Sequence, residues 1–469
     1  MYKGDSVYKV ILNYNFDLFR GELEVSEYLE KHFNQYVSDI QVAINKDNHF
    51  IEAKFISMLE EKIPLIKEIC SQIIDVSKKY SQGLIKEAYI KAYDLFDDKN
   101  SYFMVSSSRN ERNRFFYRLR PGDFRITDAN ESKEKKSELF HIKRNKKHLI
   151  SAYRYSVSGF PCLYLASRKE LAWFECGMPK QFSYCEMIID EEGDNALRLV
   201  DFSNRPMDFL SNIHNNLLNA KNDENRKEII YEYLLQYIIT YPLVAACSIK
   251  VKNRNNNFVE EYVIPQIFMQ WIRESNYFAG VIYKSSLDSN LVQGMGAINI
   301  ALPVKEFRSD GLGENLTSKI SVSNIGYLDV NEYFLKYKTY LDDIETYKND
   351  IWADLINSKY QCSYAWELIE LCETVINTYD ALMNGNYKNS ELIFSHIDCL
   401  ANHISIIYRN KKSIVDECVN EAFKHMKMKV DKDKIIKQID DFYKLMSKVV
   451  HKHMVFHFNF ENLGNYEKI

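Results

Sequence analysis

The sequence predicts a mixed α+β core flanked on both sides by helical regions. Between about residues 20 and 97, apolar residues recur at steps of three and four, the spacing of one helix face. From Phe115 to Val304, short strand-like runs interleave with shorter helical segments, and helical spacing returns after Val330. Because 469 residues exceed one hydrophobic core, we expect three parts: helical 1–110, core 111–310 and helical 325–469.

The N-terminal region is expected to form an antiparallel pair of helices. One apolar stripe consists of Ile66, Ile69, Ile73, Val76 and Tyr80. Pro64 suits the first turn of that helix, where a backbone N–H has no intrahelical partner. A second stripe after Gly83 consists of Ile85, Ala88, Ala92 and Leu95. Such stripes usually serve packing or dimerisation.

Strands are expected in the core wherever short apolar runs end in turn residues. Residues 116–120 alternate apolar and basic side chains, which would place Arg118 and Arg120 on one face of a strand. The further predicted strands are Cys162–Ala166, Leu197–Phe202, Val244–Val251, Phe278–Tyr283 and Ala297–Val304. The predicted helices between them are Glu228–Ile239 and Pro265–Glu274.

The stretch from Tyr153 to Gly177 indicates a turn, a strand and a short helix. Residues 158–161 (Ser-Gly-Phe-Pro) have the composition of a turn. Ser167 is a candidate N-cap for a helix that ends at Gly177 and carries Glu175 near its end. This unit brings Arg154, Tyr164 and Glu175 onto adjacent elements.

The C-terminal region is predicted to be helical and to bind a partner or to form homo-oligomers. Its stripes are formed by Trp366, Ile369, Cys372 and Ile376, and by Ile435, Ile439, Phe442, Met446 and Val449. The histidines His451, His453 and His457 have no acidic or cysteine partner nearby in the sequence. We therefore predict no metal site.

Composition narrows the class of partner and the compartment. A net charge of −4 gives no overall reason to expect nucleic-acid binding. The N-terminus lacks the apolar region of a signal peptide, and no apolar run approaches about 18 residues, so no membrane span is expected. The nine cysteines show no paired spacing, as expected for free thiols in the cytoplasm.

The candidate site residues of the core suit one class of reaction. Arginines bind phosphate oxygens, an aromatic face receives a flat ring, and a carboxylate stabilises a developing cation. Cleavage of the N-glycosidic bond of a dinucleotide needs these three groups, because its transition state resembles an oxocarbenium ion. It needs no metal, because the leaving nicotinamide already carries the positive charge.

Four sequence segments in order resemble the RES domain, a family of bacterial toxins and effectors that consume NAD⁺ or transfer ADP-ribose. The segments span about residues 113–306: 116–120, the run from Arg154 to Ala166 with Glu175, 262–266, and Gly280-x-x-Tyr283-x-Ser285. The resemblance implies an ADP-ribosyltransferase-like fold for the core.

The resemblance also implies roles for single residues. Arg118 and Arg154 would hold the phosphates of NAD⁺, Tyr164 would pack near the nicotinamide, and Glu175 would stabilise the ribosyl cation. Ser285 would orient that glutamate or the phosphate.

Further positions match the family less closely. Asn299 matches a common family asparagine, and Ser156 stands where many members have Asn. Arg120 is the alternative to Arg118, and Ser286 is the alternative to Ser285.

The sequence thus predicts a cytoplasmic enzyme that takes NAD⁺ as its substrate and serves toxicity or phage defence, with an antitoxin or defence protein as partner. The acceptor of ADP-ribose (water, phosphate or protein) stays open. The alternative is a non-catalytic interaction protein in which an inactive RES-like core carries partner-binding helices.

Overall fold

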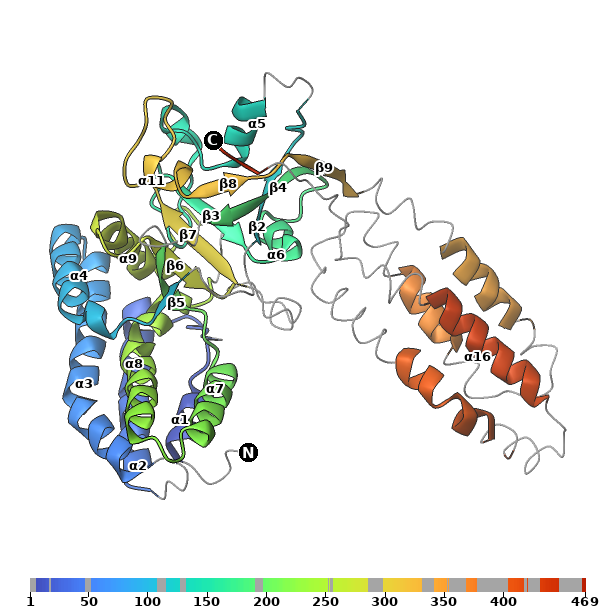
Figure 1. Ribbon diagram of the computed structural model, residues 1–469, viewed down its shortest axis with the longest axis horizontal. Coiled ribbons are helices and arrows are strands. Elements are labelled where there is room, and N and C mark those ends of the chain that lie inside the picture. The colour runs from blue at the N-terminus through green and yellow to red at the C-terminus, as the bar shows by residue number, and fades with distance from the viewer. Residues whose placement is uncertain are drawn as a thin grey trace.

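The computed structural model shows a mixed α+β protein (Figure 1). The structure describes residues 6–16, 18–46, 52–107, 115–126, 132–189, 197–251, 253, 256–285, 298–330, 341–351, 353, 368–377, 404–416, 420, 431–446 and 466–469. Within these ranges, ten strands form one sheet that has helices on both faces. The predicted class, a mixed α+β core between two helical regions, is confirmed.

The strands of the sheet follow the order β1-β5-β6-β7-β3-β2-β4-β8-β10, and β9 pairs with β4. They are β1 (Val105–Ser107), β2 (Phe115–Pro121), β3 (Cys162–Ala166), β4 (Gln181–Ile189), β5 (Arg198–Phe202), β6 (Gly280–Tyr283), β7 (Asn299–Pro303), β8 (Ile320–Val322), β9 (Gly326–Asp329) and β10 (Glu467–Lys468). β5 and β6 run parallel, whereas β3, β7 and β6 pair antiparallel. Distant parts of the chain therefore meet in the middle of the sheet.

The two faces of the sheet bury different clusters, because successive side chains of a strand point to opposite sides. On one face, Leu163 and Leu302 join a cluster that α5 (Ser132–Leu139) and α11 (Glu314–Thr317) help to cover. On the other face, Val281 and Ala301 belong to a cluster with the N-terminal helices, and Ala166 belongs to a cluster with α6 (Lys169–Glu175).

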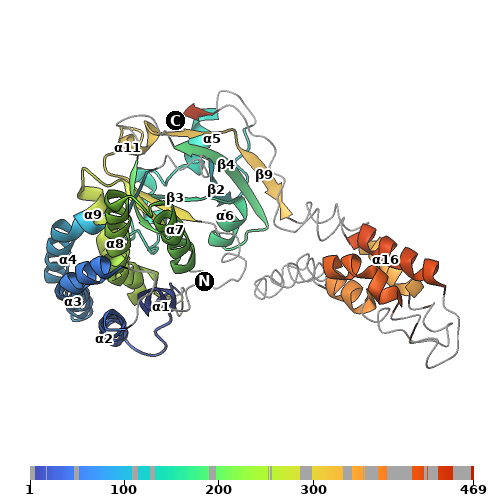
Figure 2. The same cartoon turned by 60° about the horizontal axis from the view of Figure 1, so that its bottom comes forward.

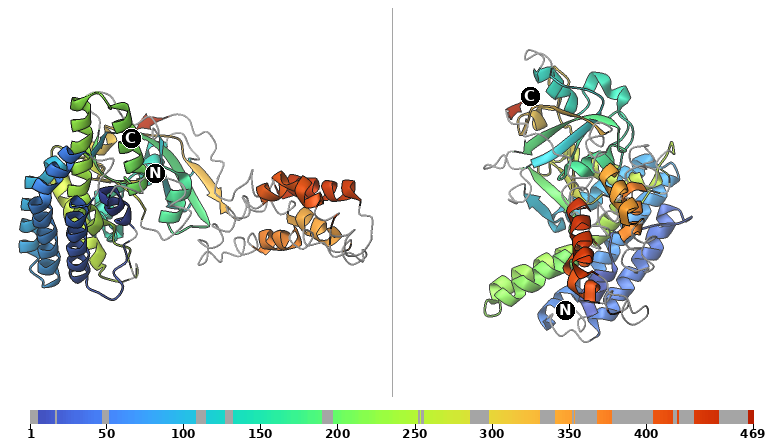
Figure 3. Two further views of the ribbon diagram at one scale, coloured as in Figure 1. Left: turned by 90° about the horizontal axis from the view of Figure 1, so that it is seen from below. Right: turned by 90° about the vertical axis from the view of Figure 1, so that its right-hand side faces the viewer.

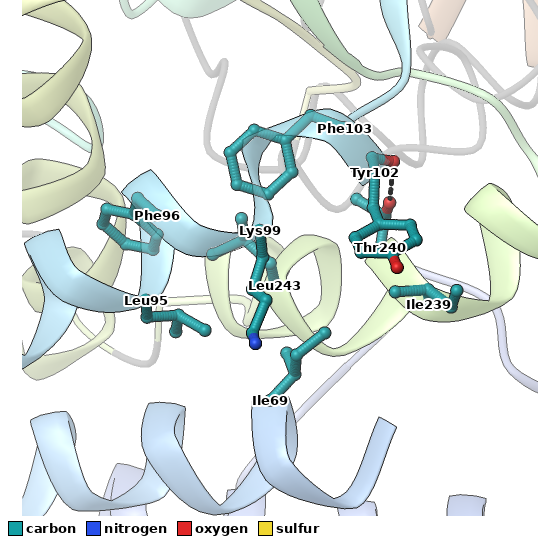
Figure 4. A pocket seen from close by; sticks show the side chains of 9 residues that line it. All are labelled: Ile69, Leu95, Phe96, Lys99, Tyr102, Phe103, Ile239, Thr240 and Leu243. Carbon is teal, nitrogen blue, oxygen red and sulfur yellow. Dashed lines mark hydrogen bonds between the residues drawn. The ribbon is translucent and has the colours of Figure 1, made fainter. Parts of the chain in front are cut away.

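The N-terminal helices and the core share one hydrophobic cluster. Its helices are α1 (Ser6–Asn13), α2 (Val25–Ile44), α3 (Ala53–Ser81), α4 (Ile85–Lys99), α7 (Pro206–Asn219), α8 (Glu224–Ser248) and α9 (Val263–Glu274). Short 3-10 helices lie at η1 (Asn100–Tyr102), η3 (Arg144–Leu149) and η5 (Glu260–Tyr262). Figure 4 shows a small hollow between α3, α4, η1 and α8. There, Thr240 Oγ1 donates a 2.9 Å hydrogen bond to Tyr102 O, and apolar side chains surround Lys99.

Helix α8 combines the length and hydropathy of a membrane span with a place in this core. Among the described helices, only α8 is long and apolar enough to cross a membrane. Its most apolar window has a mean hydropathy of 1.3, and 72% of that window is buried. Helix packing therefore accounts for its apolar character.

Three local predictions are wrong. Pro64 lies inside α3, because Phe55, Leu59 and Ile63 extend the buried stripe and the helix begins at Ala53. The predicted strand Val244–Val251 is mostly helical, since α8 runs to Ser248; a short apolar run does not distinguish a buried strand from a buried helix.

The third wrong prediction is that Ser167 caps the N-terminus of the helix that carries Glu175. The N-cap position of α6 is Arg168. Ser167 Oγ instead accepts a 2.9 Å hydrogen bond from the Ile298 N–H.

The described C-terminal helices gather to one side of the sheet (Figures 2 and 3). Helical residues are found in 341–351, 368–377, 404–409 and 411–416, and α16 spans Lys432–Met446. Ile435, Ile439, Phe442 and Met446 are buried, as their spacing predicts. Trp366, Val449 and the histidines at 451, 453 and 457 lie outside the described residues.

Candidate functional site

A carboxylate held by two donors forms the centre of the candidate site. Ser285 Oγ and Asn299 Nδ2 each donate a 2.7 Å hydrogen bond to Glu175 Oε1. Among the described residues, both hydrogen bonds to this carboxylate end on the same oxygen. Asn299 is 3% exposed, whereas Glu175 is exposed. A buried amide therefore orients a carboxylate that faces solvent.

Strand pairing explains why these three residues meet. Asn299 is the first residue of β7, where it lies opposite Ala166 of β3 and Tyr283 of β6. Ser285 follows two positions after Tyr283. Glu175 ends α6, which begins just after β3, and Gly177 with φ +77° terminates that helix.

Tyrosines line the same face of the sheet. The rings of Tyr155 and Tyr283 lie 4.7 Å apart, those of Tyr153 and Tyr164 lie 5.9 Å apart, and the Tyr164 hydroxyl donates a 3.0 Å hydrogen bond to Ser156 Oγ. Burial raises the pKa of Tyr164 and of Tyr283 well above the usual value. These phenols are therefore neutral and present aromatic surface.

Tyr283 connects the carboxylate with the arginine loop. The charge of Glu175 adds to the raised pKa of Tyr283, and the charge of Arg154 opposes it. Both charged groups are therefore close enough to influence this phenol.

The Arg154 guanidinium is engaged with the end of a helix. Nη1 donates to Cys247 O at 2.8 Å, and Nη2 donates to Ile249 O at 2.9 Å. These carbonyls end α8, where backbone acceptors lack intrahelical donors. Arg154 is 7% exposed and lies 5.4 Å from the ring centre of Tyr262. It thereby anchors the turn that carries Tyr155 and Ser156.

Gln266 holds the same turn from α9. Its Nε2 donates to Tyr153 O at 2.9 Å and to Ser156 O at 3.1 Å. The backbone N–H groups of Tyr153 and Ser156 also bond to each other's carbonyls. The turn is therefore fixed from both sides.

The two β2 arginines have different surroundings. Arg118 Nη1 donates to Tyr164 O at 3.3 Å, and its buried Nε has no hydrogen-bond partner among the described residues. Arg120 forms an ion pair with Glu138 of α5 at 3.3 Å. Of the two arginines, Arg118 reaches β3 through the backbone carbonyl of Tyr164, whereas Arg120 reaches α5.

Three cysteines surround Arg118 without forming a reactive centre. Burial raises the pKa of Cys162 and of Cys185 to about 12 and also raises the pKa of Cys176. These thiols are protonated near neutral pH and are weak nucleophiles. In the part of the chain that the structure describes, no group of three acidic, histidine or cysteine side chains could hold a metal ion.

The structure joins six of the predicted residues into two contacting groups: Glu175 with Ser285 and Asn299, and Tyr164 with Ser156 and Arg118. Ser286 lies outside the described residues. Sequence reasoning did not assign a role to Tyr283. Its spacing of two from Ser285 on a strand would have placed both side chains on one face.

The fold and this centre define a mixed α+β protein with an oriented carboxylate where β3, β6 and β7 meet. The chain is 26% identical over 300 residues to the putative toxin YopC of Bacillus subtilis (strain 168), which makes the two proteins distant homologues. The match includes 62% of this chain, and the chain spans about 63% of the length of YopC. No family model matches the chain, and no solved structure matches it.

Proposed function

We propose that this protein is an NAD⁺-consuming enzyme of the RES type that acts as a toxin or phage-defence effector. The observation that carries the proposal is the Glu175 carboxylate, oriented by Ser285 Oγ and Asn299 Nδ2. The distant homology to a putative toxin supports the biological role.

In the proposed reaction, the bond between the ribose C1′ and the nicotinamide nitrogen breaks, and its electron pair leaves with the nicotinamide. The ribose is left with oxocarbenium character, which the negative charge of Glu175 stabilises. An acceptor then attacks C1′ and loses a proton. The reaction is balanced with water, with phosphate or with a protein side chain as the acceptor, so identifying the products identifies the acceptor.

Different side chains around Glu175 bind different parts of NAD⁺ in this proposal. Arg118 supplies a guanidinium for a phosphate oxygen, and its Nε has no hydrogen-bond partner within the described ranges. Tyr164 and Tyr283 supply neutral aromatic faces for the nicotinamide. Arg154 acts through the turn that it anchors. We expect the enzyme to work in the cytoplasm, with an antitoxin or defence protein as partner.

The test is NAD⁺ loss by purified protein, with and without phosphate, followed by mass analysis of the products. Wild type should consume NAD⁺, and Glu175→Gln should not. Glu232→Gln, at an exposed carboxylate of α8, is the matched control and should behave as wild type.

Equal NAD⁺ loss in wild type and Glu175→Gln would refute the proposal. Intact NAD⁺ in both, even after cell lysate is added to supply a trigger, would favour the non-catalytic interaction protein.

A further inference from the structure

The outermost strand of the sheet comes from the far end of the sequence. β10 pairs antiparallel with β8, with Glu467 opposite Val322 and Lys468 opposite Ser321. The chain thus returns to the sheet after α16, and the label C lies beside the sheet (Figures 1 and 2). The C-terminal helices therefore lie between two core strands, β9 and β10.

One face of this strand contacts a buried lysine. Lys136 of α5 is 1% exposed, and its Nζ forms a 2.9 Å ion pair with Glu467 Oε1. Ser132 Oγ donates to the same oxygen at 3.4 Å. Two residues later, Ile469 packs against the cluster on this face of the sheet, and Arg308 Nη1 donates to Ile469 O at 2.9 Å.

The opposite face of the strand has its own contacts. The Tyr466 hydroxyl donates a 2.5 Å hydrogen bond to Glu186 Oε2 of β4. Its ring lies 6.0 Å from that of Phe115, which is 44% exposed. The sheet therefore contacts alternate side chains of β10 on both faces of the strand, as it would those of any strand added at this edge.

We propose that the β8 edge binds an extended peptide segment with the pattern aromatic, acidic, any residue, aliphatic. Tyr466–Ile469 is its resident, displaceable occupant. This proposal does not depend on the enzymatic activity.

The charge of Lys136 favours the exchange of one strand for another over an edge that has no strand. Withdrawal of Glu467 leaves the buried Lys136 ammonium without this counter-charge, which is costly in a protein interior. A competing strand with a carboxylate at the same position removes that cost, whereas a neutral or basic strand does not. The β8 edge therefore selects an acidic partner segment, and exchange detaches one of the two connections between the C-terminal helices and the sheet.

The experiment uses the full chain and a fluorescein-labelled peptide with the sequence of residues 462–469. Fluorescence anisotropy should show binding about tenfold tighter to Tyr466→Ala/Glu467→Gln than to wild type, because the resident strand competes less well. Lys136→Met in that background should weaken peptide binding about tenfold, and Lys412→Met, at an exposed lysine, should not change it.

Two results would overturn the proposal: equal peptide affinity for wild type and the double variant, or equal affinity for a peptide with Lys in place of Glu467. If the variants fail to fold, hydrogen exchange on wild type decides. Excess unlabelled peptide should accelerate exchange in residues 466–469, and unchanged exchange would contradict displacement.

Discussion

Ser285 Oγ donates a 2.7 Å hydrogen bond to Glu175 Oε1, although 110 positions separate the two residues in the sequence. Asn299 Nδ2 approaches the same oxygen at 2.7 Å from the neighbouring strand. Two donors on one oxygen fix the orientation of the carboxylate before any substrate binds. Fixed orientation is what electrostatic stabilisation of a cationic transition state requires.

Ser285→Ala and Asn299→Ala should each lower the rate of NAD⁺ consumption roughly 10- to 1,000-fold, because each removes one of the donors that orient Glu175. The loss should fall mainly on kcat, measured by steady-state kinetics. The double variant should lose less than the product of the single effects, since both act on one group. A wild-type rate in Asn299→Ala would contradict the assigned geometry.

Arg154→Ala should lower the free energy of unfolding by about 2–4 kcal/mol, because Cys247 O and Ile249 O lose their donors in a buried place. Arg118→Ala is the comparison, since the hydrogen bond that its guanidinium makes within the described part of the chain is a long one, to Tyr164 O. It should leave stability nearly unchanged and raise KM for NAD⁺. Urea unfolding and kinetics of both variants separate the roles, and equal stability losses would contradict them.

Stability should fall as the pH drops from 6.5 toward 4, because of His141. Burial lowers its pKa to about 4, and its Nε2 accepts a 2.7 Å hydrogen bond from the Gly313 N–H. The unfolded chain therefore takes up this proton first as the pH falls, which costs about 3 kcal/mol across that interval.

His141→Gln should reduce the difference in Tm between about pH 7 and about pH 4.5. Part of the dependence should remain, because burial also lowers the pKa of His32 to about 4. An unchanged pH dependence in the variant would contradict the assignment.

Gly280→Ala should destabilise the fold by about 2–3 kcal/mol through overpacking. A Cβ there would stand 2.4 Å from Ala301 O and 2.6 Å from Leu302 Cδ2. β6 would have to move away from β7, and Tyr283 would move with it. Thermal unfolding measures the effect, and Ser285→Ala, just beyond the same strand, should keep the wild-type Tm.

Local patterns predicted the elements with a clear signal. Alternation identified β2, and the small apolar run Cys162–Ala166 identified β3. No prediction covered β4, which pairs with β2, β8 and β9. Both of its faces are buried, so it lacks the polar–apolar alternation that marks a half-exposed strand.

The sequence by itself determined the class of fold, the apolar stripes of its helices and a set of candidate residues that includes Glu175. Only the tertiary structure decided that Arg154 binds the end of α8, that Tyr283 lies beside the carboxylate, and that Glu467 neutralises the buried Lys136. The reason is physical. Strand pairing and buried polar contacts join residues that are far apart in the chain, and such encounters leave no periodic signal between neighbours in the sequence.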